Sequence, residues 1–427
     1  MRATSIQLKN FRRFESFDCE FDPHFSLLMG PNGSGKTSLL RAVHLSLSVL
    51  RAFNQAGHDA ISEQEVRRAD NTDPGGIKWQ TPIFPSWVKL MVNIAGCTPM
   101  AFGRERSPGS EAPKIAADVD SQHGHSFAYQ GSPSWFDPTN SSPIPIIARF
   151  GAAKPQGTGT PGSVQRPFEK KQDIWALSDS DLSSIQGLAQ WFQYNELRKL
   201  QETDEPLVYR RVRAAVLSAI HATDIMYVVR DNALMVKHDE QGWRPFEQLS
   251  DGQLRLAAIF CDLAMRCAML NSHLGEDCIV KTPGIVTIDE LDLHLHPKWQ
   301  RDVVSDLRKV FPEVQFIVTS HSPFLLQAAF EFGRVIDMTT GKAVEPADHS
   351  IEDIAESVMD VDQPQRGKHF LEMKELAQRF YDLLEQPTHS LAEEAALKQQ
   401  LDKALAVFAN DPASAAWLEQ RRIAAGR

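Results

Sequence analysis

A glycine-rich segment near the N-terminus has the residue types and the spacing that bind phosphate groups. Residues 30–37 read Gly-Pro-Asn-Gly-Ser-Gly-Lys-Thr and match the pattern GxxxxGK[ST]. Glycines let backbone N–H groups turn inward around a phosphate, and the positive end of a following helix strengthens the binding. Lys36 would place its charge on the β- and γ-phosphates, and the Thr37 hydroxyl would be a ligand of Mg²⁺. The other candidate contacts in this segment are Asn32, Gly33, Ser34, Gly35 and Ser38.

A second group of reactive side chains lies far along the chain, at the end of an apolar run. Residues 284–290 read Gly-Ile-Val-Thr-Ile-Asp-Glu, which is typical of a buried parallel strand followed by two carboxylates. Asp289 is expected beside the Mg²⁺, and Glu290 is expected to orient or deprotonate an attacking water. Either carboxylate alone could be a simple strand cap. Together, and after a glycine loop, they favour nucleotide hydrolysis.

Two shorter motifs select a subclass. Residues 249–253, Leu-Ser-Asp-Gly-Gln, open a long predicted helix, so the Ser250 hydroxyl and the nearby amides would form an anion-binding nest. Residues 316–321, Phe-Ile-Val-Thr-Ser-His, predict a strand that ends in His321. The first motif resembles the signature of ABC-type ATPases, with one glycine replaced by Asp. The second resembles their switch segment, in which the histidine reaches the γ-phosphate.

The four motifs also occur in the order found in ABC-type ATPases. This resemblance implies that Glu290 and His321 are the catalytic residues and that ATP and Mg²⁺ are the cofactors. In this family the signature completes the site of a facing copy, which implies an ATP-dependent head-to-head homodimer with two-fold symmetry. Higher oligomers stay open. The signature residues that would contact the partner's nucleotide are Ser250, Gly252 and Gln253.

Hydrophobic periodicity predicts the elements that hold these motifs. They are strands at 5–9, 25–29, 284–288 and 314–319, a hairpin at 225–238, and helices at 37–50 and 254–270. The expected fold class is α/β. We expect an ABC-type P-loop ATPase head with a mixed core sheet, flanking helices and an antiparallel β-lobe, together with a helical, loop-rich insertion and a C-terminal helical region. The expected divisions are 1–95 and 223–345 for the head, 96–222 for the insertion and 346–427 for the C-terminal helices.

The first strand resembles the entry strand of RecF- and SMC-type heads. Residues 6–14 read Ile-Gln-Leu-Lys-Asn-Phe-Arg-Arg-Phe, and in that group a basic residue after the Asn-Phe pair helps to hold the nucleotide. Arg12 or Arg13 would take this role, and the alternative is a plain surface turn. No heptad pattern lasts three or four periods, and only residues 38–249 separate the glycine loop from the signature. A long coiled-coil arm of the SMC kind is therefore excluded.

The segment that follows the two carboxylates is the most distinctive in the chain. Residues 289–300, Asp-Glu-Leu-Asp-Leu-His-Leu-His-Pro-Lys-Trp-Gln, and residues 319–324, Thr-Ser-His-Ser-Pro-Phe, resemble compact ATPases of the RecF, SMC and OLD-like AAA group. Within that group they look like the Septu (PtuA-like) ATPase subunit and the retron-associated ATPases of bacterial anti-phage defence. Residues 149–152 are similar to a YGxxR-like segment of the same proteins. Gln156 is a candidate for the Q-loop glutamine.

Two histidines in this segment allow two interpretations. His294 and His296 stand two positions apart beside carboxylates and could bind a metal. The favoured interpretation is a loop that faces the opposite head of the dimer, because ABC heads need Mg²⁺ alone.

Composition limits the classes of partner. The chain has 427 residues, a net charge of −10, 42% hydrophobic and 23% charged residues, so its overall charge does not indicate nucleic-acid binding, which stays open. Local basic clusters at 149–154, 166–171 and 210–213 are interpreted as solvated surfaces. The five cysteines form no CxxC pair, which argues against a metal or disulfide framework. No apolar run is long enough to cross a membrane, and the N-terminus has no secretory pattern, so we expect a cytoplasmic protein.

These observations support one leading hypothesis and several alternatives. The leading hypothesis is the sensing or gating ATPase of a defence system, which acts with a separate nuclease effector of the HNH or Toprim type. The alternative is a RecF-like repair or recombination ATPase that clamps DNA directly, and a transport ATPase is a more distant third. A built-in nuclease of the OLD kind is not expected, because the Asp-Val-Asp at 360–362 follows no apolar strand.

Overall fold

The computed structural model describes most of the chain, and every structural statement below concerns the described residues. They are residues 1–52, 60–72, 78–94, 99–108, 114–115, 141–152, 185–199, 205–239, 242–344, 350–351, 354, 368–385 and 390–406. The chain divides into two units, Met1–Asp348 and His349–Arg427, which are described separately. Gln156, Cys97, the basic cluster at 166–171 and the Asp-Val-Asp at 360–362 lie outside the described residues.

A six-stranded sheet forms the centre of the first unit. In spatial order its strands are β16 (Ala343–Val344), β15 (Arg334–Asp337), β3 (Phe25–Met29), β14 (Val314–Thr319), β13 (Gly284–Ile288) and β9 (Ile146–Phe150). The five strands from β15 to β9 run parallel, and only β16 is antiparallel. All residues of β3, β13 and β14 are buried, as expected for parallel strands covered on both faces. Their carboxyl ends therefore meet at one edge of the sheet.

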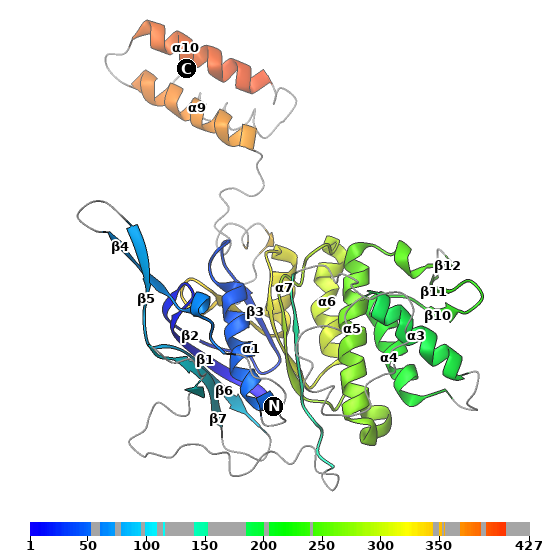
Figure 1. The fold of residues 1–427 in the computed structure, drawn as a ribbon. Helices are drawn as coiled ribbons and strands as arrows, with labels where there is room; N and C mark the ends of the chain where they lie inside the picture. Colours follow the sequence, from blue (N-terminus) through cyan, green and yellow to red (C-terminus); the bar gives the residue numbers. More distant parts are fainter. Residues whose placement is uncertain are drawn as a thin grey trace. The chain divides into compact units, whose positions relative to one another are not determined.

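An antiparallel lobe packs beside this sheet. Its strands, in spatial order, are β2 (Phe14–Glu20), β1 (Arg2–Phe11), β6 (Ser86–Asn93), β7 (Met100–Arg106) and β8 (Lys114–Ile115). In β6 every second residue is buried, which is the pattern of a sheet with one face on the core. Helix α1 (Lys36–Ala52) contacts β6 and β7 of the lobe and β13 and β14 of the core sheet. A two-stranded ribbon, β4 (Arg68–Thr72) and β5 (Lys78–Pro82), projects from this side (Figure 1).

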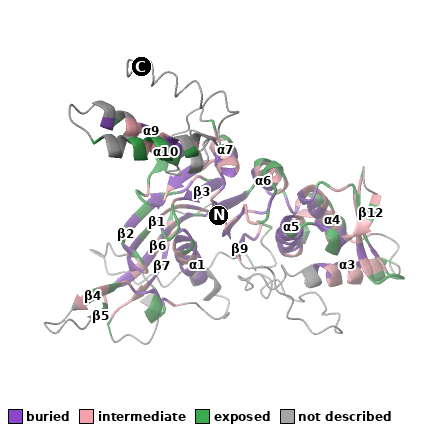
Figure 2. Cartoon of the chain, turned by 90° about the horizontal axis from the view of Figure 1, so that it is seen from above, coloured by how far each residue is buried: buried purple, intermediate pink, exposed green. Residues whose placement is uncertain are grey.

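Helices cover the other side of the core sheet. They are α3 (Ile185–Lys199), α4 (Leu207–Ala219), α5 (Asp251–Leu270), α6 (Pro297–Val310) and α7 (Pro323–Phe332), with the short 3-10 helices η3 (Phe246–Gln248) and η4 (Ser272–Asp277). A further 3-10 helix, η1 (Glu63–Glu65), lies beside the turn between β1 and β2. Almost every residue of α5 after Gln253 is buried, and α5 lies between α4 and α6 (Figure 2). A three-stranded sheet, β10 (Asp224–Val228), β11 (Ala233–His238) and β12 (Gly242–Pro245), lies beside α3 and α4. None of the described helices is both long and apolar enough to cross a membrane.

The second unit contains two helices that pack against one another. They are α9 (Lys368–Glu385) and α10 (Leu391–Ala406). Met373 and Ala377 of α9 and Leu401 of α10 are buried within this unit.

The predicted α/β head with a mixed sheet, an antiparallel lobe and flanking helices is confirmed. The predicted insertion at 96–222 includes strands that pair with the two sheets described above. Its strand β7 pairs with β6 of the lobe, and its strand β9 forms one edge of the core sheet. The basic cluster at 210–213 takes part in ion pairs, since Arg210 and Arg211 share Glu276 and Arg213 binds Asp224.

Candidate functional site

The predicted motifs gather at the carboxyl edge of the core sheet. The glycine loop (residues 30–37) follows β3, Asp289 follows β13, Ser320 follows β14 and Gly151 follows β9. These four strands are parallel neighbours, so their carboxyl ends bring together segments that are far apart in the sequence. Ligand sites in such sheets lie at this edge.

The glycine loop adopts a conformation that only glycine permits at several positions. Gly30, Gly33 and Gly35 have φ values of 148°, 78° and 100°, in the region that L side chains rarely adopt. A Cβ at Gly35 would also lie 2.3 Å from Cζ of Phe14 and 2.9 Å from Cδ of Arg13. The loop is therefore packed directly under the turn between β1 and β2.

Lys36 points back into the curl of the loop. Its Nζ donates hydrogen bonds to the carbonyl oxygens of Gly30, at 2.7 Å, and Pro31, at 3.1 Å. Burial lowers the pKa of Lys36, although the nearby carboxylates Asp289 and Glu290 act in the opposite direction. The loop therefore fixes the ammonium group where the pattern predicts the phosphates.

Asp289 is bound by two hydroxyl groups. Thr37 Oγ1 donates to Oδ2 at 2.8 Å, and Thr319 Oγ1 donates to Oδ1 at 2.6 Å. The carboxylate belongs to a residue that is only 8% exposed. A threonine hydroxyl beside a carboxylate is a set of hard oxygen ligands, which fits Mg²⁺. The residues predicted to hold the metal, Thr37 and Asp289, are thus in direct contact.

Thr319 also holds the second carboxylate residue in place. Its Oγ1 accepts a hydrogen bond from the backbone N–H of Glu290 at 2.7 Å. Glu290 has a φ of 51°, which is uncommon for a non-glycine residue and persists where surrounding contacts impose it. One buried hydroxyl therefore orients both members of the predicted Asp-Glu pair.

Arg255 connects the signature helix α5 to the same strand ends. Its guanidinium donates to the carbonyl oxygens of Asp289, at 2.6 Å, of Gly151, at 3.3 Å, and of Glu290. Burial lowers the pKa of Arg255, while the surrounding acidic groups raise it. The first turn and a half of α5 is thus tied to the loops that follow β13 and β9.

The signature (residues 249–253) forms the capped start of α5. Ser250 Oγ accepts from the N–H of Gln253 at 3.3 Å, and the Gln253 side chain accepts from the N–H of Ser250 at 3.2 Å, which is a capping box. A Cβ at Gly252 would lie 2.4 Å from the carbonyl oxygen of His294. Gly252 therefore allows the loop after β13 to pack against α5, whereas Ser250 is exposed.

The switch segment and the two-histidine loop are joined by Gln300 of α6. Gln300 Oε1 accepts from Ser322 Oγ at 2.6 Å, and its Nε2 donates to the carbonyl oxygen of Leu295 at 2.8 Å. His321 is half-buried at the start of this segment. His296 caps α6, since its Nδ1 accepts from the N–H of Lys298 at 3.3 Å. No cluster of three or more His, Cys, Asp or Glu side chains suited to a metal occurs in the described part of the chain.

The two arginines after the first strand have different surroundings. Arg12 has a φ of 49° and donates to Glu65 Oε1 at 2.9 Å, and Arg41 of α1 donates to the same oxygen at 3.0 Å. Burial alone would raise the pKa of Glu65, but hydrogen bonds from the Ser62 N–H and the two arginines outweigh it and lower the pKa. Arg13 is exposed, and its stem lies against Gly35. Arg13 is thus beside the loop, while Arg12 is held by Glu65.

Comparison with known proteins agrees with this geometry. Residues 124–327 match the family model described as "AAA domain, putative AbiEii toxin, Type IV TA system", and residues 5–74 match a second "AAA domain" model. The "Retron Ec83 probable ATPase" of Escherichia coli is 24% identical over 392 residues, which cover 76% of this chain and 69% of that protein. The chain is similar to AAA-type ATPases, among them the retron ATPases, Septu protein PtuA and RecF.

The matches to Septu protein PtuA and RecF are shorter. Septu protein PtuA of Bacillus thuringiensis is 50% identical over 84 residues, covering 20% of this chain and 21% of that protein. RecF of Protochlamydia amoebophila is 38% identical over 65 residues, covering 15% and 18%. A solved structure, the SmcHead bound to the C-winged helix domain of ScpA, covers 84% of this chain and all of its own, with a TM-score of 0.45 and 16% identity.

Several residues of the candidate site cannot be recognised from the sequence. Thr319 stands directly before the Ser-His pair of the switch segment, and this position was the available signal. Arg255 lies two residues after the signature, but nothing in the spacing indicates that it reaches the carbonyl groups of Asp289 and Glu290. Glu65 is the last residue of a Ser62-x-x-Glu65 capping box at a 3-10 helix, a pattern that predicts a helix start but not the ion pairs with Arg12 and Arg41.

The double role of Thr319 predicts a graded effect on activity. Thr319→Val keeps the shape but leaves Asp289 Oδ1 and the Glu290 N–H without their hydroxyl partner. We expect ATP turnover to fall by ~10- to 100-fold and the Mg²⁺ needed for half-maximal turnover to rise, because a buried hydrogen bond to a charged group is lost. Thr319→Ser keeps the hydroxyl and is the matched control, with near-normal values. A Mg²⁺ titration of turnover in both variants checks this, and equal values for Val and Ser would contradict it.

Proposed function

We propose that the chain binds ATP with Mg²⁺ and hydrolyses it at two composite sites, which form when two heads meet in a two-fold dimer. The hydrogen bond between Thr37 and Asp289 is the observation that carries this proposal. It joins two predicted Mg²⁺ ligands that are 252 positions apart in the sequence. The neighbouring Lys36 and Glu290 then have positions suited to the phosphates and to the attacking water.

Each residue of the site has a proposed role. Lys36 and the amides of residues 32–38 bind the phosphates, and Arg13 adds a positive charge beside the loop. Bound Mg²⁺ neutralises phosphate charge, and its proposed ligands are Thr37 and Asp289. Glu290 orients or deprotonates water, and His321 contacts the γ-phosphate. These assignments are proposals that follow from position and chemistry.

The proposal of a dimer rests on the different surroundings of the two sides of the signature. Gly252 is packed against His294 of the same chain, whereas Ser250 is exposed at the N-terminus of a long helix. Exposed amides and a positive helix end attract an anion. Resemblance to ABC-type ATPases suggests that this anion is the γ-phosphate held by the facing head. Ser250, Gly252 and Gln253 would then complete the partner's site.

The biological role that we propose is sensing or gating in a cytoplasmic anti-phage defence system, with a separate nuclease effector of the HNH or Toprim type. The similarity to a retron ATPase and to Septu protein PtuA supports this role. The alternative is a RecF-like ATPase that clamps DNA directly, which the RecF similarity in a short region supports. In the first case the chain alone has no nuclease activity.

Mixing two inactive variants tests the composite site. Lys36→Ala disables the phosphate loop, and Ser250→Arg blocks the signature, so each variant alone should lose ATP turnover. In a mixed dimer one of the two sites combines an intact loop with an intact signature. An equal mixture should therefore regain about a quarter of the normal turnover if the chains pair at random, and up to about half if neither variant pairs with itself. Normal turnover by Ser250→Arg alone, or no recovery on mixing, would contradict a shared site.

The role of Glu290 predicts a trapped state. Glu290→Gln keeps the size of the side chain but removes its charge and its basicity. ATP binding should persist, while hydrolysis falls by ~10²- to 10⁴-fold, as for the loss of a general base. Because hydrolysis reopens the heads, the variant should accumulate as an ATP-bound dimer, measurable as oligomer mass with and without ATP and Mg²⁺. Lys36→Ala is the control and should lose nucleotide and dimer together. Full turnover by Glu290→Gln would refute its catalytic role.

The proposal of a separate nuclease effector predicts which part of the system cuts nucleic acid and which part of this chain binds the effector. The purified chain should cut neither DNA nor RNA with ATP and Mg²⁺ present. Deleting residues 351–427 should weaken co-purification of the nuclease partner and leave ATP turnover intact, because the Met1–Asp348 unit contains the whole site. Cleavage by the chain alone would overturn the division of labour. Tight, salt-sensitive DNA binding without any partner would favour the RecF-like alternative.

A further inference from the structure

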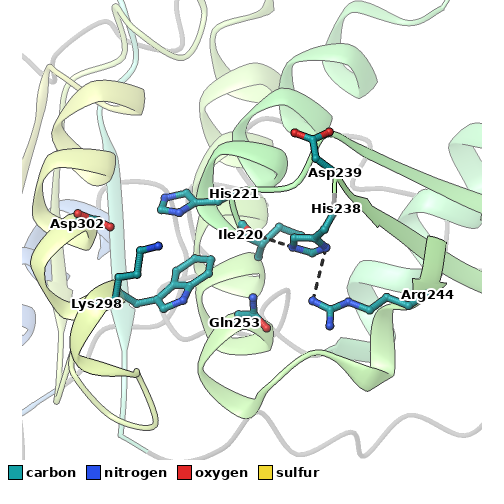
Figure 3. A pocket seen from close by; sticks show the side chains of 9 residues that line it. Ile220, His221, His238, Asp239, Arg244, Gln253, Lys298 and Asp302 are labelled. Atoms are coloured by element: carbon teal, nitrogen blue, oxygen red, sulfur yellow. Dashed lines mark hydrogen bonds between the residues drawn. The ribbon is translucent and has the colours of Figure 1, made fainter. Parts of the chain in front are cut away.

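A pocket beside the signature has a lining in which only Gln253 has a role in the proposed ATP site. It lies where the end of α4, the strands β11 and β12, and the first turns of α5 and α6 meet, with a volume of about 360 Å³. Figure 3 shows Lys298 on one side and Arg244 on the opposite side, with Gln253 between them. This size is at the lower end of small-ligand pockets and suits one nucleotide unit rather than a longer segment.

The cations of the pocket are available to a ligand. Arg244 contacts His238 Nδ1 at 3.5 Å, and its buried Nε has no hydrogen-bond partner within the described part of the chain. Lys298 is exposed, and among the described residues it forms no ion pair. Gln253 and Lys298 belong to the first turns of α5 and α6, so the positive ends of two helices also face this region. An anionic group between Arg244 and Lys298 would give both side chains an oppositely charged partner.

An aromatic pair forms another part of the wall. The rings of His221 and Trp299 are stacked, with centroids 4.5 Å apart and planes 16° apart. His221 Nε2 lies 2.9 Å from Asp306 Oδ2, which fixes the orientation of its ring, and its side chain is still 41% exposed. Stacking on aromatic side chains is the common way in which proteins hold a nucleobase.

The carboxylates that line the pocket favour a nucleotide over a simple anion as its ligand. Asp239 and Asp302 line the same pocket and would repel a free phosphate. A nucleotide, in contrast, carries ribose hydroxyls and base amino groups that donate hydrogen bonds to carboxylates. The amide of Gln253 offers both a donor and an acceptor to a base edge. The mixture of charges therefore fits a ligand with an anionic end and a donor-rich, planar end.

We propose that this pocket binds one nucleotide unit, with its phosphate between Arg244 and Lys298 and its base against the His221–Trp299 pair. The unit is either a free mononucleotide or the phosphorylated end of a nucleic-acid strand. Gln253 lines the pocket and also caps Ser250, so occupancy would reach the signature, a consequence that depends on the proposed dimer mechanism. Binding itself does not depend on that mechanism.

The test uses the full chain carrying Lys36→Ala, so that the phosphate loop does not contribute. Calorimetric titration with nucleoside 5′-monophosphates should show binding that is at least about tenfold tighter than that of inorganic phosphate. Adding Lys298→Ala should weaken it by about tenfold or more, the effect of losing one charged hydrogen bond. Lys309→Ala is the matched control, because it removes the same charge from the same helix outside the pocket. Lys298 is exposed, so its substitution leaves the fold intact.

Two further binding measurements identify the source of the nucleotide unit, and specific results would reject the proposal. A 5′-phosphorylated oligodeoxynucleotide that binds as tightly as the monophosphate, while its 5′-hydroxyl form does not, assigns the pocket to strand ends. If the monophosphate binds and neither oligonucleotide does, the pocket is assigned to free nucleotides. Equal affinities for Lys298→Ala and Lys309→Ala, or equal affinities for the monophosphate and inorganic phosphate, overturn the proposal. Normal ATP turnover in the otherwise unmodified Lys298→Ala chain separates these failures from a failure of the proposed ATPase mechanism.

Discussion

The carboxylate of Asp289 accepts hydrogen bonds from two hydroxyl groups, and the rest of the site depends on this arrangement. A carboxylate that is almost fully buried requires donors, and here both come from elements at neighbouring strand ends. Thr37 follows β3 and Thr319 ends β14, so β14 must lie next to both β3 and β13. The order of the parallel sheet is therefore a condition for the site, and a different order would leave the carboxylate without partners.

Arg255 extends this constraint from the sheet to the signature helix. A buried guanidinium is costly unless its N–H groups are satisfied, and the carbonyl groups at the ends of β13 and β9 satisfy them. Rotating α5 would break these bonds and leave a buried cation without partners. The start of α5 and the two carboxylates therefore move together. A change at the signature, such as contact with a facing head, would reach Asp289 and Glu290 through the same guanidinium.

Sequence patterns predicted the parts of the structure in which local chemistry determines the outcome. The apolar runs of β3, β13 and β14 and the positive-φ glycines of the loop are local features, and each was identified. The strands β2, β4, β5, β6, β7, β8, β12, β15 and β16 were not predicted, because most of them are partly polar or only two to five residues long, although several pair with a neighbour in the sequence. Thr319 and Arg255 were missed for a related reason. Their hydrogen bonds join positions about 30 residues apart in the sequence. No spacing rule indicates that a side chain of α5 or of the end of β14 will reach the end of β13. The choice between Arg12 and Arg13 depended on Glu65, whose capping-box motif does not indicate that it binds Arg12.

The signature region shows how one element can meet two requirements. On its inner side Gly252 has no side chain, and this lets the loop after β13 approach closely enough for Leu295 and Gln300 to join that loop to the switch segment. On its outer side Ser250 and Asp251 are exposed. An alanine at position 252 would push the loop away by its contact with His294, whereas an arginine at position 250 would occupy only the outer surface. The inner side therefore sets the geometry within one head, and the outer side is the part available to a second head or to a ligand in the adjacent pocket. Because both sides belong to the same first turn of α5, a ligand or partner on the outer surface would act on a segment that Arg255 connects to Asp289 and Glu290.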